Sequence, residues 1–291
     1  MFTPENTVIG FIGIGVMGKS MASHLLSAGF PMVIYNRSKE KAEELVQNGA
    51  IWVSTPKEVT QQANVIFTIV GYPKDVEEVY LGEQGILTNG KPNTYVIDMT
   101  TSTPTLAVKI YEEAKRKGIH ALDAPVSGGD IGAKEAKLSI MVGGEKEVFQ
   151  ELEPLFNILG TNVVYQGKAG AGQHTKMCNQ IAIASNMIGV CEAIVYAGKA
   201  GLDPKKVLTS ITSGAAGSWS LSNLAPKMIE GDFEPGFYIK HFIKDMKIAL
   251  EEADAMGMET PGLSLAKRLY EHLAENGEEN SGTHTLYKYW Q

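Results

Sequence analysis

The first 165 residues alternate between short apolar runs and longer segments in which apolar residues recur every three or four positions. The short runs are partly β-branched, which is typical of buried strands, and the longer segments have the periodicity of helices. Strands and helices that alternate in this way predict a parallel, doubly wound α/β sheet. The expected strands are 7–13, 32–35, 64–70, 94–99, 119–123, 137–142 and 162–165, and the expected helices are 17–28, 39–48, 73–80, 104–117 and 145–159.

The stretch between Gly170 and Gly201 is apolar on nearly every face and contains no proline. We predict that it forms one helix of about 28 residues, roughly 42 Å long. A helix this apolar requires burial all round, between other helices or subunits. Polar residues within it argue against a membrane span: Lys176, Asn179, Gln180, Asn186, Glu192 and Lys199.

After Leu202 the pattern is helical throughout, and no internal repeat or low-complexity linker interrupts it. A chain of 291 residues suits two domains. We therefore predict a doubly wound α/β domain over residues 1–168, followed by an all-α domain over residues 169–291 that begins with the long helix.

Residues 13–18 read Gly-Ile-Gly-Val-Met-Gly and lie between an expected strand and an expected helix. In this place the first glycine permits a tight turn, the second lets the backbone approach a pyrophosphate, and the third lets helix and strand pack closely. The motif also fits a plain strand-to-helix turn, but its position favours a dinucleotide-binding (Rossmann) domain. The predicted cofactor contacts are Gly13, Ile14, Gly15, Val16, Met17 and Gly18.

The strand 32–35 is followed by Asn36, Arg37 and Ser38, at the position where the two nicotinamide cofactors are distinguished. An acidic residue here would bind the ribose hydroxyls and repel a 2′-phosphate. Charge-assisted bonds from Arg37 to a phosphate contribute on the order of 1.5–3 kcal/mol each. NADP is therefore the expected cofactor, with NAD as the alternative if Arg37 is only a solvated surface residue. Ser38 is also placed to cap the following helix.

Ligands of doubly wound sheets lie at the carboxyl ends of the strands. Residues 70–73 and 98–101 hold such positions, so Val70 and Thr101 are expected to border the cofactor. The same residues also suit ordinary turns.

Composition narrows the class of protein. Hydrophobic residues make up 44% of the chain and charged residues 20%, as in ordinary globular proteins. The net charge is −7, and no basic cluster is present to bind a nucleic acid. Both cysteines, Cys178 and Cys191, fall in the apolar helix, so we expect reduced core thiols and a cytoplasmic protein without a signal peptide.

Three patches carry polar groups that packing does not require. The serine and two glycines at 127–129 follow a strand and offer free backbone N–H groups to an anion such as a carboxylate. Lys176 lies near the start of the apolar helix, with Asn179 and Gln180 one turn later, and a buried cation is costly unless it has a function. Lys244–Asp245 lies in another expected helix.

With these motifs the chain resembles the 3-hydroxyisobutyrate dehydrogenase family of β-hydroxyacid dehydrogenases. The matching stretches follow the family's order over most of the chain: GFIGIGVMG at 10–18, DAPVSGG at 123–129, GAGQHTKMCN at 170–179 and Lys244–Asp245. The resemblance implies an NAD(P)-binding Rossmann domain and an all-α domain that forms the subunit interface. It also implies a catalytic lysine at Lys176, a substrate carboxylate on Ser127, Gly128 and Gly129, and nicotinamide contacts from Thr101 and Lys244.

The chain departs from this pattern next to the lysine. Many relatives have asparagine four residues after it, where this chain has Gln180, with Asn179 one position earlier. Both amides are candidates for the substrate contact, and the sequence leaves the choice open.

A lysine acts as a general acid and base at neutral pH only if its pKa falls from about 10.4. Burial and the second ammonium of Lys244 would both lower it. In the oxidative direction Lys176 would take the hydroxyl proton as hydride leaves the same carbon. Without the family resemblance, a snorkelling lysine at a helix end explains the residue equally well.

Other polar and aromatic residues have plainer interpretations. Trp219 is either a wall of the substrate pocket or a core residue, and His174 is read as a helix-start residue rather than an acid or base. The aromatic tail at 287–290 is expected to dock on the protein body or a neighbouring subunit. No ligand spacing indicates a metal site.

We therefore predict an NADP-preferring dehydrogenase or reductase of a small β-hydroxyacid or its semialdehyde, such as 3-hydroxyisobutyrate, tartronate semialdehyde, glyoxylate or succinic semialdehyde. The alternatives are a 6-phosphogluconate dehydrogenase relative, an imine reductase relative, and a non-catalytic nucleotide-sensing or interaction protein on the same scaffold. The expected partners are a small carboxylate-bearing substrate and further copies of the chain in a dimer or tetramer, without nucleic acid or membrane. The oligomer is expected to form through the helical domain, because so apolar a helix needs more cover than one copy supplies.

Overall fold

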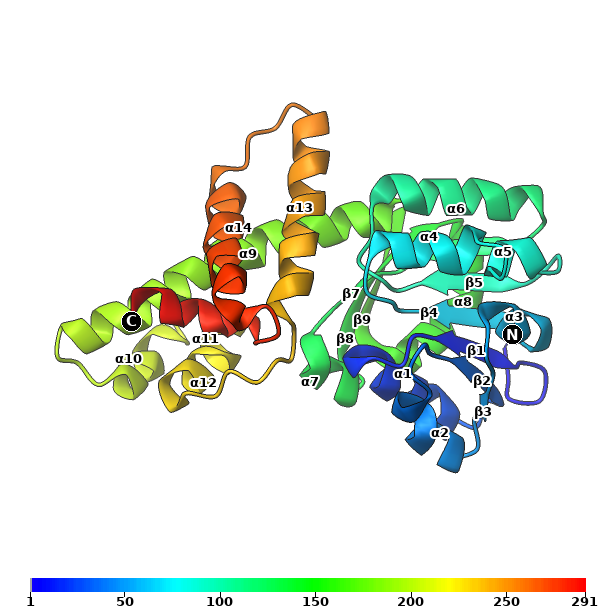
Figure 1. The fold of residues 1–291 in the computed structure, drawn as a ribbon, viewed down its shortest axis with the longest axis horizontal. Coiled ribbons are helices and arrows are strands. Elements are labelled where there is room, and N and C mark those ends of the chain that lie inside the picture. The colour runs from blue at the N-terminus through cyan, green and yellow to red at the C-terminus, as the bar shows by residue number, and fades with distance from the viewer. Residues whose placement is uncertain (1) are drawn as a thin grey trace. The chain divides into compact units, whose positions relative to one another are not determined.

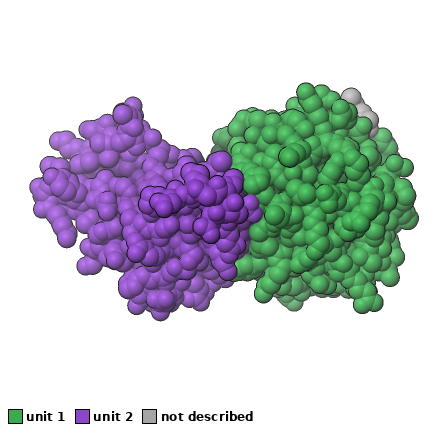
Figure 2. All heavy atoms as spheres, turned by 90° about the horizontal axis from the view of Figure 1, so that it is seen from above, with its two compact units in different colours: residues 1–176 green, residues 177–291 purple. Residues whose placement is uncertain are grey.

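The computed structural model describes residues 2–291, and the chain divides into two units inside its longest helix. Unit 1 ends at Lys176, and unit 2 begins at Met177 (Figure 2). Each unit has hydrophobic core clusters of its own. The predicted domain boundary between residues 168 and 169 lies just before this helix and stays a prediction.

Unit 1 is built on one nine-stranded sheet (Figure 1). The strands are β1 (Ile9–Ile12), β2 (Met32–Tyr35), β3 (Ile51–Trp52), β4 (Val65–Thr68), β5 (Tyr95–Asp98), β6 (His120–Asp123), β7 (Val126–Ser127), β8 (Leu138–Gly144) and β9 (Gly160–Gly167). Their order is β3-β2-β1-β4-β5-β6-β8-β7, and β9 pairs with β8. All neighbours from β3 to β6 run parallel, which confirms the doubly wound α/β prediction for this part of the sheet.

The prediction of an entirely parallel sheet is wrong at one edge. Strand β8 runs antiparallel to both β6 and β7, whereas β9 runs parallel to β8. Because β7 ends at Ser127 and β8 begins at Leu138, only residues 128–137 connect them. A parallel crossover needs about a dozen residues or more, so this short connection returns the chain in the opposite direction.

Helices cover both faces of the sheet (Figure 1). They are α1 (Val16–Ser27), η1 (Lys39–Ala42), α2 (Glu43–Gln47), α3 (Pro56–Gln62), α4 (Pro73–Leu81), α5 (Ile86–Asn89), α6 (Pro104–Arg116), α7 (Gly129–Lys134) and α8 (Lys146–Leu159). Core residues of α1, α2 and α8 pack with Ile9 and Phe11 on one face, and core residues of α3 to α6 pack with Ile12 on the other. Successive residues of β1 therefore serve two cores, as the pleat requires.

The predicted helix 39–48 is split into η1 and α2. In its first turn Lys41 N donates to Ser38 O, three residues back, so this turn is a 3₁₀ helix. The predicted cap is wrong, since the Ser38 side chain makes no capping hydrogen bond. The sequence also missed several elements that are too short to display a period: β3, α3, α5, β7 and α7.

The predicted long helix is α9 (Ala171–Lys199), with 29 residues. A single copy of the chain does not cover all sides of α9. Exposed residues recur along one face: His174, Cys178, Ala182, Ser185, Gly189, Glu192 and Tyr196. Any cover of this face by another subunit stays a prediction.

The exposed face also corrects the interpretation of the cysteines. Cys178 is exposed and is not a core thiol, whereas Cys191 is buried, and burial raises the pKa of its thiol. By length and composition alone α9 is able to cross a membrane, and 39% of its most apolar 18-residue window is buried in the protein. A core helix passes the same test, so the prediction that α9 does not span a membrane stays a prediction.

Unit 2 is all-helical, as predicted, and the part of α9 from Met177 onward contributes to its core. Its other helices are α10 (Pro204–Ile211), α11 (Trp219–Asn223), α12 (Ala225–Glu230), α13 (Ile239–Ala255), α14 (Pro261–Leu273), η2 (Ala274–Glu278) and η3 (Thr283–Trp290). The aromatic tail forms η3, where Leu286 is fully buried and Tyr287 and Trp290 pack on the core of unit 2. The prediction that the tail docks on the protein body is confirmed.

His284 in η3 provides a test of this docking. Its Nε2 lies 2.7 Å from Asp232 O, its ring stacks on Phe233, and burial lowers its pKa below the usual value of 6.5. The folded state therefore favours neutral His284, so stability should fall as pH drops below about 6.5 because the unfolded chain binds the proton more readily. We expect His284→Gln to weaken this pH dependence in urea unfolding between pH 7.5 and 5. The exposed His174→Gln serves as the comparison variant, and equal pH profiles for wild type and His284→Gln would contradict the prediction.

Candidate active site

The predicted dinucleotide motif forms the turn between β1 and α1. A Cβ atom on Gly13 would lie 2.0 Å from Ile69 O, and one on Gly18 would lie 1.9 Å from Gly13 O, so both positions exclude a side chain. A Cβ atom on Gly15 would meet no other atom within 4 Å. The loop therefore packs closely at its two ends and leaves an open backbone surface at Gly15, where α1 begins with no acidic residue in its first turn. This is the shape and polarity that a pyrophosphate requires.

The residues after β2 join this loop. The Asn36 side chain accepts a hydrogen bond from Ile14 N at 2.9 Å and donates one to Ser38 O at 2.8 Å. Arg37 is 77% exposed at its side chain, and its guanidinium pairs with Asp75 Oδ1 at 3.3 Å. Asn36 thus holds the glycine loop in place, whereas Arg37 is exposed enough to exchange its partner for a ligand.

Asp98 organises the ends of β4 and β5. Its Oδ1 accepts hydrogen bonds from Thr68 Oγ1 and Thr100 N, both at 3.0 Å, and Thr100 Oγ1 accepts one from Val70 N at 3.0 Å. Burial, with a smaller contribution from the nearby charge of Asp123, raises the pKa of Asp98 to about 6 despite the hydrogen bonds that it accepts. The network fixes the backbone around Val70 and Thr100, and half-buried Thr101 follows Thr100 in the loop after β5.

Asp123, at the end of β6, caps the start of α9. Its carboxylate accepts hydrogen bonds from Gly170 N at 2.8 Å and Gln173 N at 2.9 Å. A Cβ atom on Gly143 or Gly172 would lie less than 3 Å from its oxygens, so both glycines leave room for the carboxylate. A negative charge at a helix amino terminus is stabilised by the helix dipole. Asp123 therefore anchors the helix that carries Lys176.

Gln173 makes a second connection between α9 and the sheet. Its Oε1 accepts from Ser102 N at 3.0 Å and its Nε2 donates to Thr100 O at 2.7 Å. The sequence assigned no role to Asp123 or Gln173, although both lie in the matched stretches.

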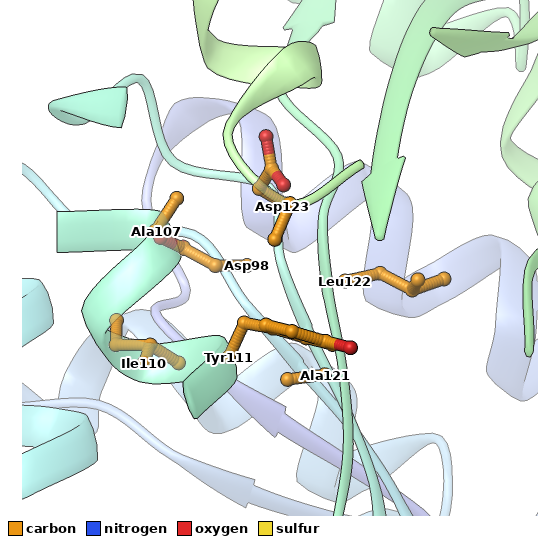
Figure 3. Close-up of a pocket in the computed structure, with 8 residues that line it drawn as sticks. Asp98, Ala107, Ile110, Tyr111, Ala121, Leu122 and Asp123 are labelled. Carbon is orange, nitrogen blue, oxygen red and sulfur yellow. The ribbon is translucent and has the colours of Figure 1, made fainter. Parts of the chain in front are cut away.

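A small cavity lies beside these groups, between β5, β6 and α6 (Figure 3). It has room for about one water molecule. Its size excludes a substrate, so it is an internal gap and not the active site. Its lining residues are Asp98, Ala107, Ile110, Tyr111, Ala121, Leu122, Asp123 and Ala169.

Lys176 and the serine-glycine-glycine run meet within unit 1. The Lys176 side chain is almost completely buried, and its Nζ donates to Val126 O at 2.8 Å. Val126 directly precedes Ser127, and Gly128 and Gly129 both have positive φ angles, +134° and +63°, which favour glycine. A Cβ atom on Gly129 would meet nothing within 4 Å. An ammonium group therefore lies beside an open, glycine-rich backbone segment that suits an anionic ligand.

The remaining predicted residues lie in unit 2. Asn179 and Gln180 form a hydrogen-bonded row with Asp245, which pairs with Lys244 at 2.8 Å. Trp219 is the first residue of α11 and is 51% exposed, so it is not a core residue. Among residues 2–291, Trp219 shares no hydrogen bond or ring contact with that row. Its predicted place in the substrate pocket stays a prediction.

Known proteins resemble this chain over nearly its whole length. Residues 8–167 match the family described as the NAD binding domain of 6-phosphogluconate dehydrogenase. Residues 170–290 match the family described as NAD-binding of NADP-dependent 3-hydroxyisobutyrate dehydrogenase.

Individual relatives agree with these matches. An uncharacterized oxidoreductase of Bacillus subtilis is 66% identical, with 97% of this chain and 98% of the relative covered. The 2-hydroxy-3-oxopropionate reductase of Escherichia coli is 39% identical, with 92% of each chain covered. A solved structure of Psf3 in complex with NADP+ and 2-OPP has a TM-score of 0.91 and 26% identity, with 97% of this chain and 100% of that chain covered.

Proposed function

The chain belongs to the 3-hydroxyisobutyrate dehydrogenase family of β-hydroxyacid dehydrogenases, and on that premise we propose that it oxidises a small β-hydroxyacid to its semialdehyde, or reduces the semialdehyde, with Lys176 as the general acid and base. The chain is an NAD(P)-dependent hydroxyacid dehydrogenase that binds NADP(H). The observation that carries the proposal is the buried ammonium group of Lys176, held 2.8 Å from Val126 O beside Ser127.

The residues of unit 1 fit the cofactor. The backbone at Gly15 and the amino terminus of α1 would hold the pyrophosphate, Arg37 would meet a 2′-phosphate, and Val70 with Thr101 would border the nicotinamide end. A cofactor held there would supply the hydride chemistry, as the acceptor in oxidation and the donor in reduction, at C4 of its nicotinamide.

Lys176 would supply the proton transfer. In oxidation the substrate carbon loses its C–H bond as hydride, and the neutral amine takes the proton of the hydroxyl group. In reduction the ammonium returns that proton to the developing alkoxide. Burial disfavours the charged amine, and the hydrogen bond to Val126 O holds Nζ in one position, so the side chain is prepared for either step.

The backbone of residues 127–129 would bind the substrate carboxylate. The Ser127 hydroxyl and the N–H groups of Gly128 and Gly129 are donors, and positive φ angles at both glycines turn the backbone sharply at this point. A carboxylate fixed here has its β-carbon two bonds away, which brings the reacting hydroxyl within reach of the neighbouring Lys176. This geometry favours short 3-hydroxyacids over longer ones.

Arg37 supports NADP as the preferred cofactor. We expect Arg37→Ser to raise the dissociation constant of NADPH about tenfold and that of NADH less than about threefold. The expected loss of NADPH binding free energy is small for a charge-assisted bond, because the exposed guanidinium must first leave Asp75. Fluorescence titration with both cofactors measures it, and the exposed Arg268→Ser serves as the charge-matched control. Equal weakening of NADPH and NADH would contradict the assignment.

A panel of short 3-hydroxyacids and semialdehydes, assayed with NADP(H) and NAD(H) in parallel, tests the proposed function. We expect turnover of compounds with a carboxylate two bonds from the reacting carbon, and faster turnover with the phosphorylated cofactor. Binding of NADPH without turnover of any member of the panel would refute the proposal and favour a nucleotide-sensing role.

A further inference from the structure

Resting on the proposed function, we propose that Asn179 selects substrates that carry a hydrogen-bond donor at C2, a hydroxyl or an ammonium group, and that Gln180 and Asp245 set its orientation. The proposal starts from a row of hydrogen bonds inside unit 2. Asn179 Nδ2 donates to Gln180 Oε1 at 2.7 Å, and Gln180 Nε2 donates to Asp245 Oδ2 at 2.6 Å. The other oxygen of Asp245 pairs with Lys244 Nζ at 2.8 Å.

Asp245 fixes the direction of the row. An ionised carboxylate accepts hydrogen bonds and donates none. Asp245 is almost completely buried, and its two oxygens face the Lys244 ammonium group and Gln180 Nε2. Gln180 must therefore turn its NH₂ toward Asp245 and its carbonyl oxygen toward Asn179. Asn179 must in turn direct its own NH₂ toward Gln180, so neither amide is free to flip.

This order leaves one amide end available for a ligand. Gln180 is 0% exposed and uses both ends of its side chain, so it is not placed to meet a substrate. Asn179 is half-buried, and its Oδ1 accepts no hydrogen bond from any of residues 2–291. Lys176 lies three residues earlier on α9, a spacing at which side chains are neighbours on a helix. The available acceptor therefore lies one turn from the proposed acid and base.

The chemistry of the substrate decides which group meets this acceptor. The carboxylate is itself an acceptor and would be repelled by Asn179 Oδ1. The reacting oxygen has a proton in the alcohol but none in the semialdehyde, so an acceptor facing it would be unsatisfied in one half of the reaction. A hydroxyl or ammonium group at C2 keeps its donor in both states. A C2 methyl group would leave Asn179 Oδ1 without a partner, which is costly in a closed site.

The test compares glycerate, which has a C2 hydroxyl, with 3-hydroxyisobutyrate, which has a C2 methyl group, using both enantiomers of each and NADP+. We expect wild-type kcat/KM to be at least about tenfold higher for glycerate. Asn179→Leu should lower kcat/KM for glycerate about tenfold or more and change that for 3-hydroxyisobutyrate less than about threefold. Gln180→Met, which retains Asn179 but frees it to flip, should lose part of the discrimination.

Thermal melting and NADPH titration check that each variant is folded. The ratio of kcat/KM for glycerate to that for 3-hydroxyisobutyrate is measured on the wild type, so this part of the test does not depend on the folding of any variant. Preference of the wild type for 3-hydroxyisobutyrate would overturn this proposal and leave the proposed function intact. Equal losses for both substrates in Asn179→Leu would also overturn it. Oxidation of neither substrate by the wild type, with NADPH bound normally, would refute the proposed function and this proposal with it.

Discussion

Lys176→Met is expected to lower kcat about 10³-fold while the dissociation constant of NADPH changes less than about threefold. Methionine matches the length of the lysine stem and fills the same buried space without the amine, so packing at the start of α9 should be retained. The loss arises because no other group would take or return the hydroxyl proton. Steady-state kinetics in both directions and a fluorescence titration of NADPH measure the two quantities.

Lys176→Arg separates proton transfer from simple charge. Arginine keeps a positive group near Val126 but does not lose its proton at accessible pH. If Lys176 is the acid and base, the arginine variant should be nearly as slow as the methionine variant. Substantial activity of Lys176→Arg would instead indicate that the residue acts as a fixed cation on the substrate. A methionine variant within tenfold of wild type would exclude both roles.

The elements predicted most accurately are those whose burial is indicated by a local run of apolar residues in the sequence. Strand β2 has the predicted bounds, and α9 is within a few residues of them, because both are continuous apolar segments with clear ends. The two-residue strand β7 has no period to detect, and the direction of β8 follows from the length of its connection. The burial of Cys178 was predicted wrongly because composition does not reveal which face of an apolar helix the chain itself covers.

The motifs of the candidate site were recognisable in the sequence, but the contacts that support them were not. Lys176, residues 127–129 and the glycine loop stood out as candidates because each combines a special residue type with a place at an element's end. The contacts from Asp123 to Gly170 and Gln173 join residues about 50 positions apart, and no periodic pattern encodes such pairs. The likeness of Asn179 to Gln180 hid a difference in hydrogen bonding, since Gln180 uses both ends of its amide and Asn179 uses only its Nδ2 end.

Gly15→Ala is expected to weaken NADPH binding about 100-fold, or about 2.7 kcal/mol, without lowering the thermal stability of the cofactor-free protein. The φ angle at Gly15 is −87°, which alanine adopts without strain, and the new methyl group would meet no protein atom within 4 Å. The methyl group would occupy the open surface that the pyrophosphate needs, at the amino terminus of α1. Only the bound state should therefore be penalised.

Gly18→Ala is the matched comparison, since the same methyl group is added three residues later in the same loop. Its Cβ would lie 1.9 Å from Gly13 O, a backbone atom that moves only if β1 and α1 separate. We expect a lower melting temperature without cofactor, because such overpacking costs about 1–3 kcal/mol. Thermal melting and NADPH titration on both variants then distinguish the two glycines. Gly15 should affect cofactor affinity, and Gly18 should affect the stability of the cofactor-free protein. A normal affinity in a stable Gly15→Ala variant would show that the pyrophosphate does not approach the backbone at this loop.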